Sequence, residues 1–531
     1  MPELPDTPAN GAVAALAVAI DQCIALGDRE AARQLIGEGT RLAADHPALL
    51  VRRGRLAVIE GAFDRALEDF RRATALEPSN PRIWLDRARA AARSLQWPEA
   101  VQAFEQWIAL KGPRADILAE LGHARANGGD LPGAIAAFRT SLEQKPAQSE
   151  VWNDLGARLM DAEEFSDAIG AFQRALDFNP NLRAAKANLC VAHSWQGNAA
   201  AAVSALRPAE SASDRQTLGA TLLSFGRLTE GWPEYRQRLE NPNHRGWHRG
   251  IPKPMWSGGD LSGQRLLIWS DQGLGDQILV AGLLRDASAR AARIVFACEP
   301  RLFSIIARSL PDVRCVPITE IHRGKVDLSD IDAHASISEI GASLRVDITS
   351  FPNHGGYLRA DPEHSKQLAD KYRALPGNGP VVGLSWRSAN EAVGSDKSID
   401  LSAWGPILSV PNARFVSLQY GDVSDVPSSV HVDPAINPVA DLDGFAAQVS
   451  AMDIVVSVSN TTVHMAGALG VATLCLTPKV EGRPWYWFAG HETSPWYPSV
   501  RHVWQTRRGA WGDVLQQAAQ LLMNAPPSLT R

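Results

Sequence analysis

A carboxylate directly follows a glycine turn in the middle of the chain. Residues 266–269 are apolar and are expected to form a strand, residues 273–275 (Gly-Leu-Gly) to form a turn, and Asp276 to stand at the start of an apolar helix. A strand, a glycine turn and a helix start are typical of nucleotide-type α/β domains. A dinucleotide is not expected, because Ile278 stands where the dinucleotide-binding pattern has its third glycine. The alternative is that Asp276 only caps its helix, since the helix dipole favours a carboxylate there.

A second polar cluster precedes a helix near the end of the chain. Residues 459–470 (SNTTVHMAGALG) place four small polar side chains before an Ala/Gly-rich segment. The first helical turn would offer backbone N–H groups and the hydroxyls of Thr461 and Thr462, which suit a phosphate. Helix capping is the alternative role for these threonines.

Alternating apolar and polar segments from residue 264 onward predict two α/β domains, residues 264–376 and 377–531. The first should contain strands at 265–270, 293–297, 313–317 and 333–337. The second should contain strands at 381–386, 414–420, 453–458 and 472–476. Helices are expected at 277–287, 300–309, 339–344, 362–375 and 511–523, with others beginning near 441 and 461. Residues 214–263 are expected to form a helical linker and a loop rich in Gly and Pro.

A 34-residue period organises the N-terminal part of the chain. Units that begin at residues 47, 81, 115 and 149 share small residues at the eighth and twentieth places and Phe at the twenty-fourth. This pattern closely resembles the tetratricopeptide repeat, in which paired antiparallel helices stack into a curved surface that holds a peptide or protein. Weaker copies at 12–45 and 182–213 extend the predicted array over residues 12–213.

The sixth place of successive units is polar: Asp86, Glu120, Asp154 and Asn188. In a stacked array these positions line up along the inner helices. One interpretation is a ladder that binds the acceptor protein; the other is an ordinary solvated face.

Composition excludes several classes of protein. A net charge of −5 without a basic run gives no reason to expect a nucleic-acid partner. The five cysteines are scattered, which argues against a zinc site or a disulfide framework and favours a reducing compartment. The apolar run 12–20 is too short to span a bilayer and no basic residue precedes it, so we expect neither a membrane span nor a signal peptide, and a cytoplasmic location.

Four further motifs follow the repeats in order: Gly231-Trp232-x-x-Tyr235-x-x-Arg238, Gln272–Asp276, Ser457–Gly470 and Ser494–Pro498. Together they resemble bacterial tetratricopeptide-repeat glycosyltransferases related to heptosyltransferases. The resemblance implies a GT-B architecture, with two facing Rossmann-like domains that hold the acceptor (264–376) and the nucleotide-sugar donor (377–531). It also implies no metal requirement.

The resemblance assigns roles to particular residues. Asp276 matches the family's general base, which takes the proton of the acceptor hydroxyl as its oxygen attacks the anomeric carbon. Ser459 departs from the family, whose members usually carry an acid there. The predicted donor-binding residues are Asn460, Thr461, Thr462, Val463, His464, Arg387 and Lys397. For His464 the alternative is a histidine packed within its helix. For Arg387 and Lys397 the alternative is a charged side chain in a solvated loop.

An array fused to a transfer module suggests a protein acceptor. Family members of this layout include enzymes that glycosylate flagellin on Ser or Thr with nonulosonic acids, so CMP-pseudaminic acid is one candidate co-substrate, although the sequence does not choose among UDP, GDP, ADP and CMP donors. The alternatives are transfer to lipopolysaccharide or another polysaccharide, and an adaptor without catalytic activity. No cofactor is expected.

Overall fold

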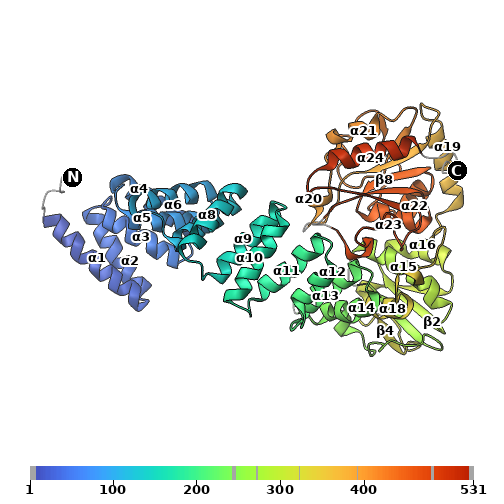
Figure 1. Cartoon of the computed structure of the whole chain (residues 1–531), viewed down its shortest axis with the longest axis horizontal. Coiled ribbons are helices and arrows are strands. Elements are labelled where there is room, and N and C mark those ends of the chain that lie inside the picture. The colour runs from blue at the N-terminus through green and yellow to red at the C-terminus, as the bar shows by residue number, and fades with distance from the viewer. Residues whose placement is uncertain are drawn as a thin grey trace. The chain divides into compact units, whose positions relative to one another are not determined.

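The computed structural model of this protein describes residues 8–241, 247–270, 273–321, 323–390, 393–479 and 483–524. It divides into two compact units, Met1–Ala192 and His193–Arg531 (Figure 1). Over the described ranges no helix is both long and apolar enough to cross a membrane.

The first unit consists of consecutive antiparallel helix pairs, drawn from blue to cyan in Figure 1. Four first helices begin at residues 47, 81, 115 and 149, as the 34-residue period predicts. The helices are α1 (Pro8–Leu26), α2 (Arg29–Leu42), α3 (Pro47–Ile59), α4 (Phe63–Leu76), α5 (Pro81–Arg93), α6 (Trp97–Lys111), α7 (Ala115–Asn127), α8 (Leu131–Gln144), α9 (Ser149–Asp161), α10 (Phe165–Phe178) and α11 (Arg183–Trp195), the last of which crosses the boundary between the units.

Glycine and phenylalanine set the spacing within a helix pair. A Cβ atom added to Gly122 would lie 2.7 Å from the ring of Phe138, and one added to Gly156 would lie 2.5 Å from the ring of Phe172. Because both rings are buried, a larger residue at the eighth place would push the two helices of the repeat apart. The aromatic residue therefore packs over the glycine of its own repeat.

The second unit contains two parallel sheets. The first has the strand order β3-β2-β1-β4 and the second the order β10-β9-β8-β5-β6-β7. The strands are β1 (Arg265–Trp269), β2 (Arg293–Cys298), β3 (Val313–Pro317), β4 (Ala333–Ala335), β5 (Val381–Ser385), β6 (Arg414–Ser417), β7 (Val430–His431), β8 (Ile454–Val458), β9 (Thr473–Thr477) and β10 (Val500–Trp504). Every predicted strand is present, whereas β7 and β10 were not predicted.

Helices and short 3-10 turns surround these sheets (Figure 1). The helices are α12 (Ala199–Leu206), α13 (Ala212–Ser224), α14 (Leu228–Arg236), α15 (Leu274–Ser288), α16 (Phe303–Ser309), α17 (Ile318–Ile321), α18 (Ile337–Leu344), α19 (Pro362–Arg373), α20 (Gly394–Lys397), α21 (Gly405–Leu408), α22 (Leu442–Ser450), α23 (Thr461–Leu469) and α24 (Trp511–Met523). The 3-10 turns are η1 (Gln237–Glu240), η2 (Trp247–Gly250), η3 (Pro300–Leu302), η4 (Ile348–Ser350), η5 (Leu401–Trp404) and η6 (Trp485–Trp487).

One continuous hydrophobic core joins the two sheets. It includes Leu266 and Ile268 from β1 and Val455 from β8, together with the apolar faces of α15 and α23, which pack against each other. The opposite faces of the sheets have separate cores, to which Leu267 and Val456 belong. Alternate residues of each strand thus face different layers, as the pleat requires.

The Gly231–Arg238 motif is structural. The indole of Trp232 donates to the carbonyl of Arg345 at 2.8 Å, and its ring lies against Gly341 of α18. Arg238 donates to the hydroxyl of Ser338 at 2.6 Å and lies over the ring of Tyr235. The motif therefore fixes α14 and η1 on the first sheet domain.

We expect the sheet-bearing unit to lose stability in acid through His334. The indole of Trp269 donates to Nδ1 of His334, and burial, with a smaller effect of His248, lowers the pKa of His334 to about 4. Below the ordinary histidine pKa of about 6.5, the imidazole binds a proton in the unfolded state but not in the folded state, so acidification favours unfolding.

The contribution of His334 should lower the free energy of unfolding by about 3 kcal/mol as the pH drops from 6.5 to 4. Urea unfolding of wild type and His334→Gln across this range checks it. Glutamine keeps an acceptor for the indole, so equal pH dependence in the two proteins would contradict the assignment.

Candidate functional site

The N-termini of two helices face one pocket of about 390 Å³. Its walls include residues 273–276 at the start of α15, residues 459–461 before and at the start of α23, and three side chains from other elements, Arg301, Lys397 and Tyr486. The first turn of a helix leaves backbone N–H groups without intrahelical partners and carries the positive end of the helix dipole. Two such ends at one pocket suit an anion.

Asp276 is the third residue of α15 and lines the pocket. The helix begins at Leu274, three residues earlier than predicted, because the extended backbone of Gly273 serves as its N-cap. The negative charge of Asp276 acts on both Lys397 and Tyr486, so the three side chains share one environment. Gln272, the first residue of the predicted motif, lies outside the described residues.

Gly275 allows the two helices to approach. A Cβ atom at this position would lie 2.7 Å from Cδ2 of His464 on α23. His464 is buried among aromatic residues, so it has no room to give way. The glycine of the turn is therefore required by helix packing, not by a bound dinucleotide.

The start of α23 separates the predicted donor residues. Asn460 caps the helix, since its Oδ1 accepts from the backbone N–H of Thr462 at 2.9 Å, so that N–H is not free for a ligand. Asn460 and Thr461 line the pocket. Thr462 is fully buried with its hydroxyl 3.3 Å from that of Ser385, and Val463 lies in the hydrophobic core.

His464 lines the pocket but is held by protein groups on both ring nitrogens. Nδ1 lies 2.8 Å from the hydroxyl of Tyr497, and Nε2 lies 3.2 Å from that of Tyr486. The ring stacks on Trp487. Burial, with a smaller effect of Lys397, lowers the pKa of His464 to about 3, so the imidazole is neutral near pH 7.

The two predicted loop cations lie in different places. Lys397 lines the pocket with only 8% of its surface exposed, and among the described residues its ammonium has no hydrogen-bond or ion-pair partner. Burial lowers its pKa, an effect that Asp276 partly opposes. Arg387 is exposed and does not line the pocket; its positive charge acts on Asp400 and Asp422.

Tyr486 and Arg301 line the pocket and were not singled out by sequence reasoning. Tyr486 lies between Trp485 and Trp487, and Arg301 follows β2. Burial, reinforced by Asp276, raises the pKa of Tyr486 well above its ordinary value. The proximity of Tyr486 to Asp276 arises from the fold, since 210 residues separate them in sequence.

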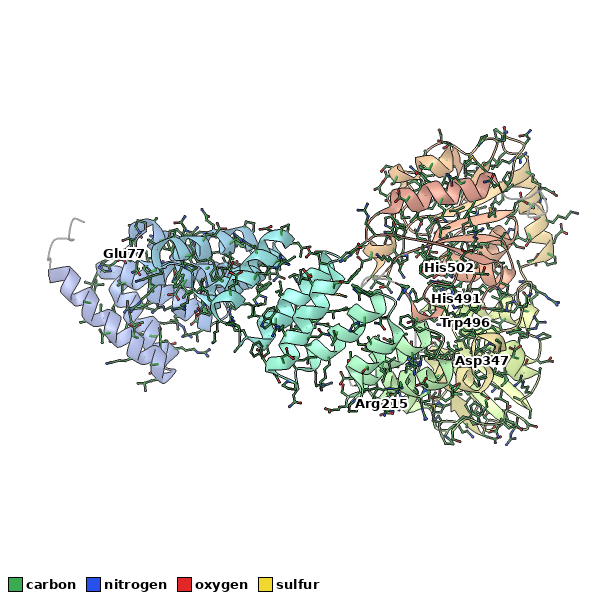
Figure 2. All side chains as sticks on the ribbon, viewed as in Figure 1. Glu77, Arg215, Asp347, His491, Trp496 and His502 are labelled. Atoms are coloured by element: carbon green, nitrogen blue, oxygen red, sulfur yellow. The ribbon has the colours of Figure 1, made fainter. Side chains whose placement is uncertain are left out.

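The tryptophans near the pocket support it from behind. The indole of Trp487 donates to the hydroxyl of Ser459 at 2.8 Å. Trp496, labelled in Figure 2, packs edge-on against Phe351 at 4.8 Å, and Trp485 packs edge-on against Trp232 at 5.3 Å. None of Trp485, Trp487 and Trp496 lines the pocket.

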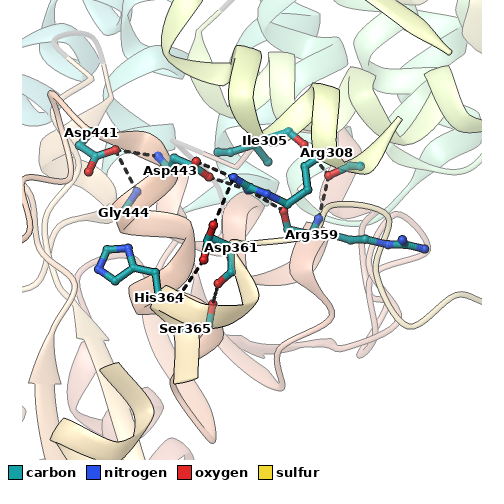
Figure 3. A network of polar contacts seen from close by, with 10 residues as sticks. Ile305, Arg308, Arg359, Asp361, His364, Ser365, Asp441, Asp443 and Gly444 are labelled. Carbon is teal, nitrogen blue, oxygen red and sulfur yellow. Dashed lines mark hydrogen bonds and ion pairs between the residues drawn. The ribbon is translucent and has the colours of Figure 1, made fainter. Parts of the chain in front are cut away.

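An arginine on α16 connects the two sheet domains (Figure 3). Arg308 donates two parallel hydrogen bonds of 2.7 Å to the carboxylate of Asp443, in the first turn of α22, and a third to the carbonyl of Arg359 at 3.2 Å. On the pocket wall, Arg301 donates to the carbonyl of Val439. Bidentate pairs of this kind fix orientation as well as distance.

The polar ladder of the array is paired internally. Arg55 donates to Asp86 at 2.8 Å, and Arg89 donates to Glu120 at 2.9 and 2.6 Å. In the next units, Nε2 of His123 lies 3.3 Å from Asp154, and Asn188 donates to Asn153 at 2.9 Å. Each predicted acceptor-binding residue thus contacts the preceding repeat, and the charges of Asp86 and Glu120 are compensated by arginines.

Within the described ranges, no group of three or more His, Cys, Asp or Glu side chains is placed to hold a metal ion. That the chemistry needs no metal stays a prediction.

Comparisons identify the array. The chain matches the tetratricopeptide repeat family at residues 24–81, 51–116, 85–149 and 119–182. It is 32% identical to Protein FlbA from Caulobacter vibrioides over an alignment of 322 residues. This alignment covers 57% of this chain and 53% of that protein. This chain thus aligns with about half the length of that relative, whose name states no activity.

Two solved structures resemble parts of the chain. The match to the crystal structure of MamA covers 29% of this chain and 89% of the MamA chain at 19% sequence identity, with a TM-score of 0.28. The second structure is the C-terminal part of a TPR repeat-containing protein from Cytophaga hutchinsonii. The match covers 43% of this chain and 97% of that chain at 13% sequence identity, with a TM-score of 0.37.

Residues 24–182 therefore carry tetratricopeptide repeats, which indicate a protein-interaction role, and a parallel α/β region follows the array. The glycosyltransferase resemblance stays a prediction.

We expect Lys397→Met to weaken binding of inorganic pyrophosphate about tenfold, because a buried charge-assisted contact to the anion is lost. The empty protein should at the same time unfold at a higher urea concentration, since an unpaired buried charge is costly. Isothermal titration calorimetry and urea unfolding measure the two effects. Lys366→Met removes an exposed lysine as the control; equal effects of both variants would contradict the role of Lys397.

The Arg89–Glu120 pair is partly exposed, so we expect it to contribute little to stability. A double-mutant cycle with Arg89→Ala and Glu120→Ala should give a coupling free energy below about 1 kcal/mol, decreasing with added salt. Urea unfolding followed by circular dichroism measures it. A coupling above about 2 kcal/mol would instead identify the ladder as a structural support of the array.

Proposed function

We propose that this protein is an inverting glycosyltransferase in which the array binds a protein acceptor and the two sheet domains form a GT-B pair. One observation carries the proposal: Asp276 lines the same pocket as the N-terminus of α23 and the ammonium of Lys397, which no described residue pairs. A base and an anion site at one pocket are what sugar transfer from a nucleotide donor requires.

In the proposed reaction the donor phosphate binds at Thr461, at the positive end of the α23 dipole and against the ammonium of Lys397. The carboxylate of Asp276 takes the proton of the acceptor hydroxyl as that oxygen attacks the anomeric carbon from the opposite face. The bond from the anomeric carbon to the phosphate oxygen breaks, and the leaving nucleotide keeps the electron pair. Lys397 and the helix dipole stabilise its added negative charge.

The environment of Lys397 supports an anionic ligand. A lysine that is buried and has no partner among the described residues is destabilising in the empty protein. A bound phosphate would supply the missing counter-charge, so ligand binding and charge compensation would be one event. The neutral Ser459, which holds the indole of Trp487, adds no repulsion toward that phosphate.

The proposed acceptor is a protein hydroxyl, with flagellin as the first protein to test because the sequence resemblance implies it. A nonulosonic acid such as pseudaminic acid, carried by CMP, is the corresponding donor to test first. The second candidate function is an adaptor without catalysis, which the repeat array favours by itself. Both functions share the protein partner and differ in whether Asp276 reacts.

We expect Asp276→Asn to reduce sugar transfer about a thousandfold, because the amide cannot accept the hydroxyl proton. Nucleotide affinity should change little, since the phosphate site is on α23. Intact-mass analysis of flagellin co-expressed with each variant measures transfer, and a thermal-shift panel of UDP, GDP, ADP and CMP measures binding.

Asp312→Asn, an exposed carboxylate on the same sheet domain, is the matched control. Transfer by Asp276→Asn at the wild-type rate would refute the base assignment. Binding of flagellin without any added mass, in wild type as well, would favour the adaptor.

A further inference from the structure

The side chain of Asn460 joins two parts of the pocket wall. Its Oδ1 accepts from the backbone N–H of Thr462 at 2.9 Å and thereby caps α23. Its Nδ2 donates to the carbonyl of Arg387 at 2.9 Å and to the hydroxyl of Ser385 at 2.8 Å. A backbone N–H only donates and a backbone carbonyl only accepts, so these partners fix which end of the amide is the oxygen. The cap of α23 is therefore hydrogen-bonded to the chain that leaves β5.

These bonds leave Asn460 no hydrogen for a ligand. A side-chain amide has two N–H hydrogens, and Ser385 and Arg387 accept both of them. Phosphate oxygens are acceptors, so the remaining amide oxygen of Asn460 offers a phosphate no hydrogen bond. Asn460 lines the pocket with only 6% of its surface exposed. Its contacts therefore point to the protein and not to a phosphate.

The chain between Trp386 and Ile399, here called the Lys397 loop, is closed at its base by two hydrogen bonds. The N–H of Ile399 donates to the carbonyl of Trp386 at 2.9 Å, and the N–H of Ser388 donates to the hydroxyl of Ser398 at 3.0 Å. Trp386 and Ile399 are both buried in the hydrophobic core. Because Lys397 directly precedes Ser398, its place in the pocket depends on how this base is held.

Gln419, which follows β6, holds the start of the Lys397 loop from the other side. Its Oε1 accepts from the N–H groups of Trp386 and Arg387, each at 2.8 Å. Its Nε2 donates to the carbonyl of Tyr420 at 2.9 Å. The start of the loop is thus held between β6 and the cap of α23, and on the side of α23 the holding group is Asn460.

We propose that Asn460 is a positioning residue for Lys397: it holds the Lys397 loop against the cap of α23, so that the ammonium and the helix dipole face the same phosphate. The inference rests on the anion site of the proposed function. One side chain serves both halves of that site, since its oxygen caps the helix and its NH₂ group holds the loop. The buried ammonium of Lys397 has no partner among the described residues to keep it in place, so the loop must do so.

The test is a double-mutant cycle in the full-length protein, with inorganic pyrophosphate as the probe. Asn460→Ser keeps a hydroxyl that caps the helix but has no NH₂ group to hold the loop. Isothermal titration calorimetry should show pyrophosphate binding weakened about fivefold, because the ammonium is no longer held at the anion. In the Lys397→Met background the same change should alter binding by less than about 1.5-fold, because the group that Asn460 positions is gone.

Two further variants control for helix capping and for folding. Asn198→Ser changes the cap of α12 in the same compact unit and should leave pyrophosphate binding unchanged in both backgrounds. Ser398→Ala opens the base of the Lys397 loop without altering α23, and should weaken binding only when Lys397 is present. Urea unfolding of each variant shows whether the protein is folded.

The outcomes separate the inference from the proposed function. If Asn460→Ser has no effect on binding, or weakens it equally with and without Lys397, the positioning role is wrong and the proposed function stands. If the wild type does not bind pyrophosphate, the anion site is wrong and both fail. If the expected coupling is found but the wild type transfers no sugar to any hydroxyl acceptor, only the proposed function is wrong.

Discussion

The contact between Gly275 and His464 is the constraint on which the candidate site depends. It lets the first turn of α15 lie directly against α23, inside a core that is continuous between the two sheets. Because both helices follow parallel strands, their N-termini emerge at the carboxyl edges of the two sheets, where ligands of α/β domains bind. A side chain at position 275 would separate the two helices, and with them the carboxylate and the anion site.

The charged groups of the pocket are arranged at a cost to stability. Lys397 is buried without a partner among the described residues, and Asp276 lies near it in surroundings that also raise the pKa of Tyr486. Neutral groups support them: the indole–hydroxyl bond of Trp487 to Ser459 and an uncharged His464. The Arg308–Asp443 pair holds α22 to α16 outside this region (Figure 3). Strain of this electrostatic kind is typical of functional sites, where perturbed groups are kept because a ligand relieves them.

Two kinds of contact hold the repeat array together. Its helices are spaced by glycine–phenylalanine contacts within a repeat and joined by polar pairs between repeats. Since each carboxylate of the ladder has a partner in the preceding unit, a protein bound there would meet both donors and acceptors. Such a surface favours hydrogen bonding to a backbone over attraction to one sign of charge.

The sequence by itself determined the repeats, the strands and helices of the α/β region apart from β7, β10 and a few short helices, and the two helix starts that flank the pocket. These features depend on local patterns: a 34-residue period, alternating apolar segments, and glycine or small polar residues at helix starts. It did not determine which candidates share a pocket. The sequence predicts one polar loop for Arg387 and Lys397, yet only Lys397, at the end of α20, lines the pocket with Asp276. Thr462 turns inward although it neighbours Thr461. The contact of Tyr486 with His464 and the pairing of Arg308 with Asp443 join residues from different segments, so only tertiary packing decides them.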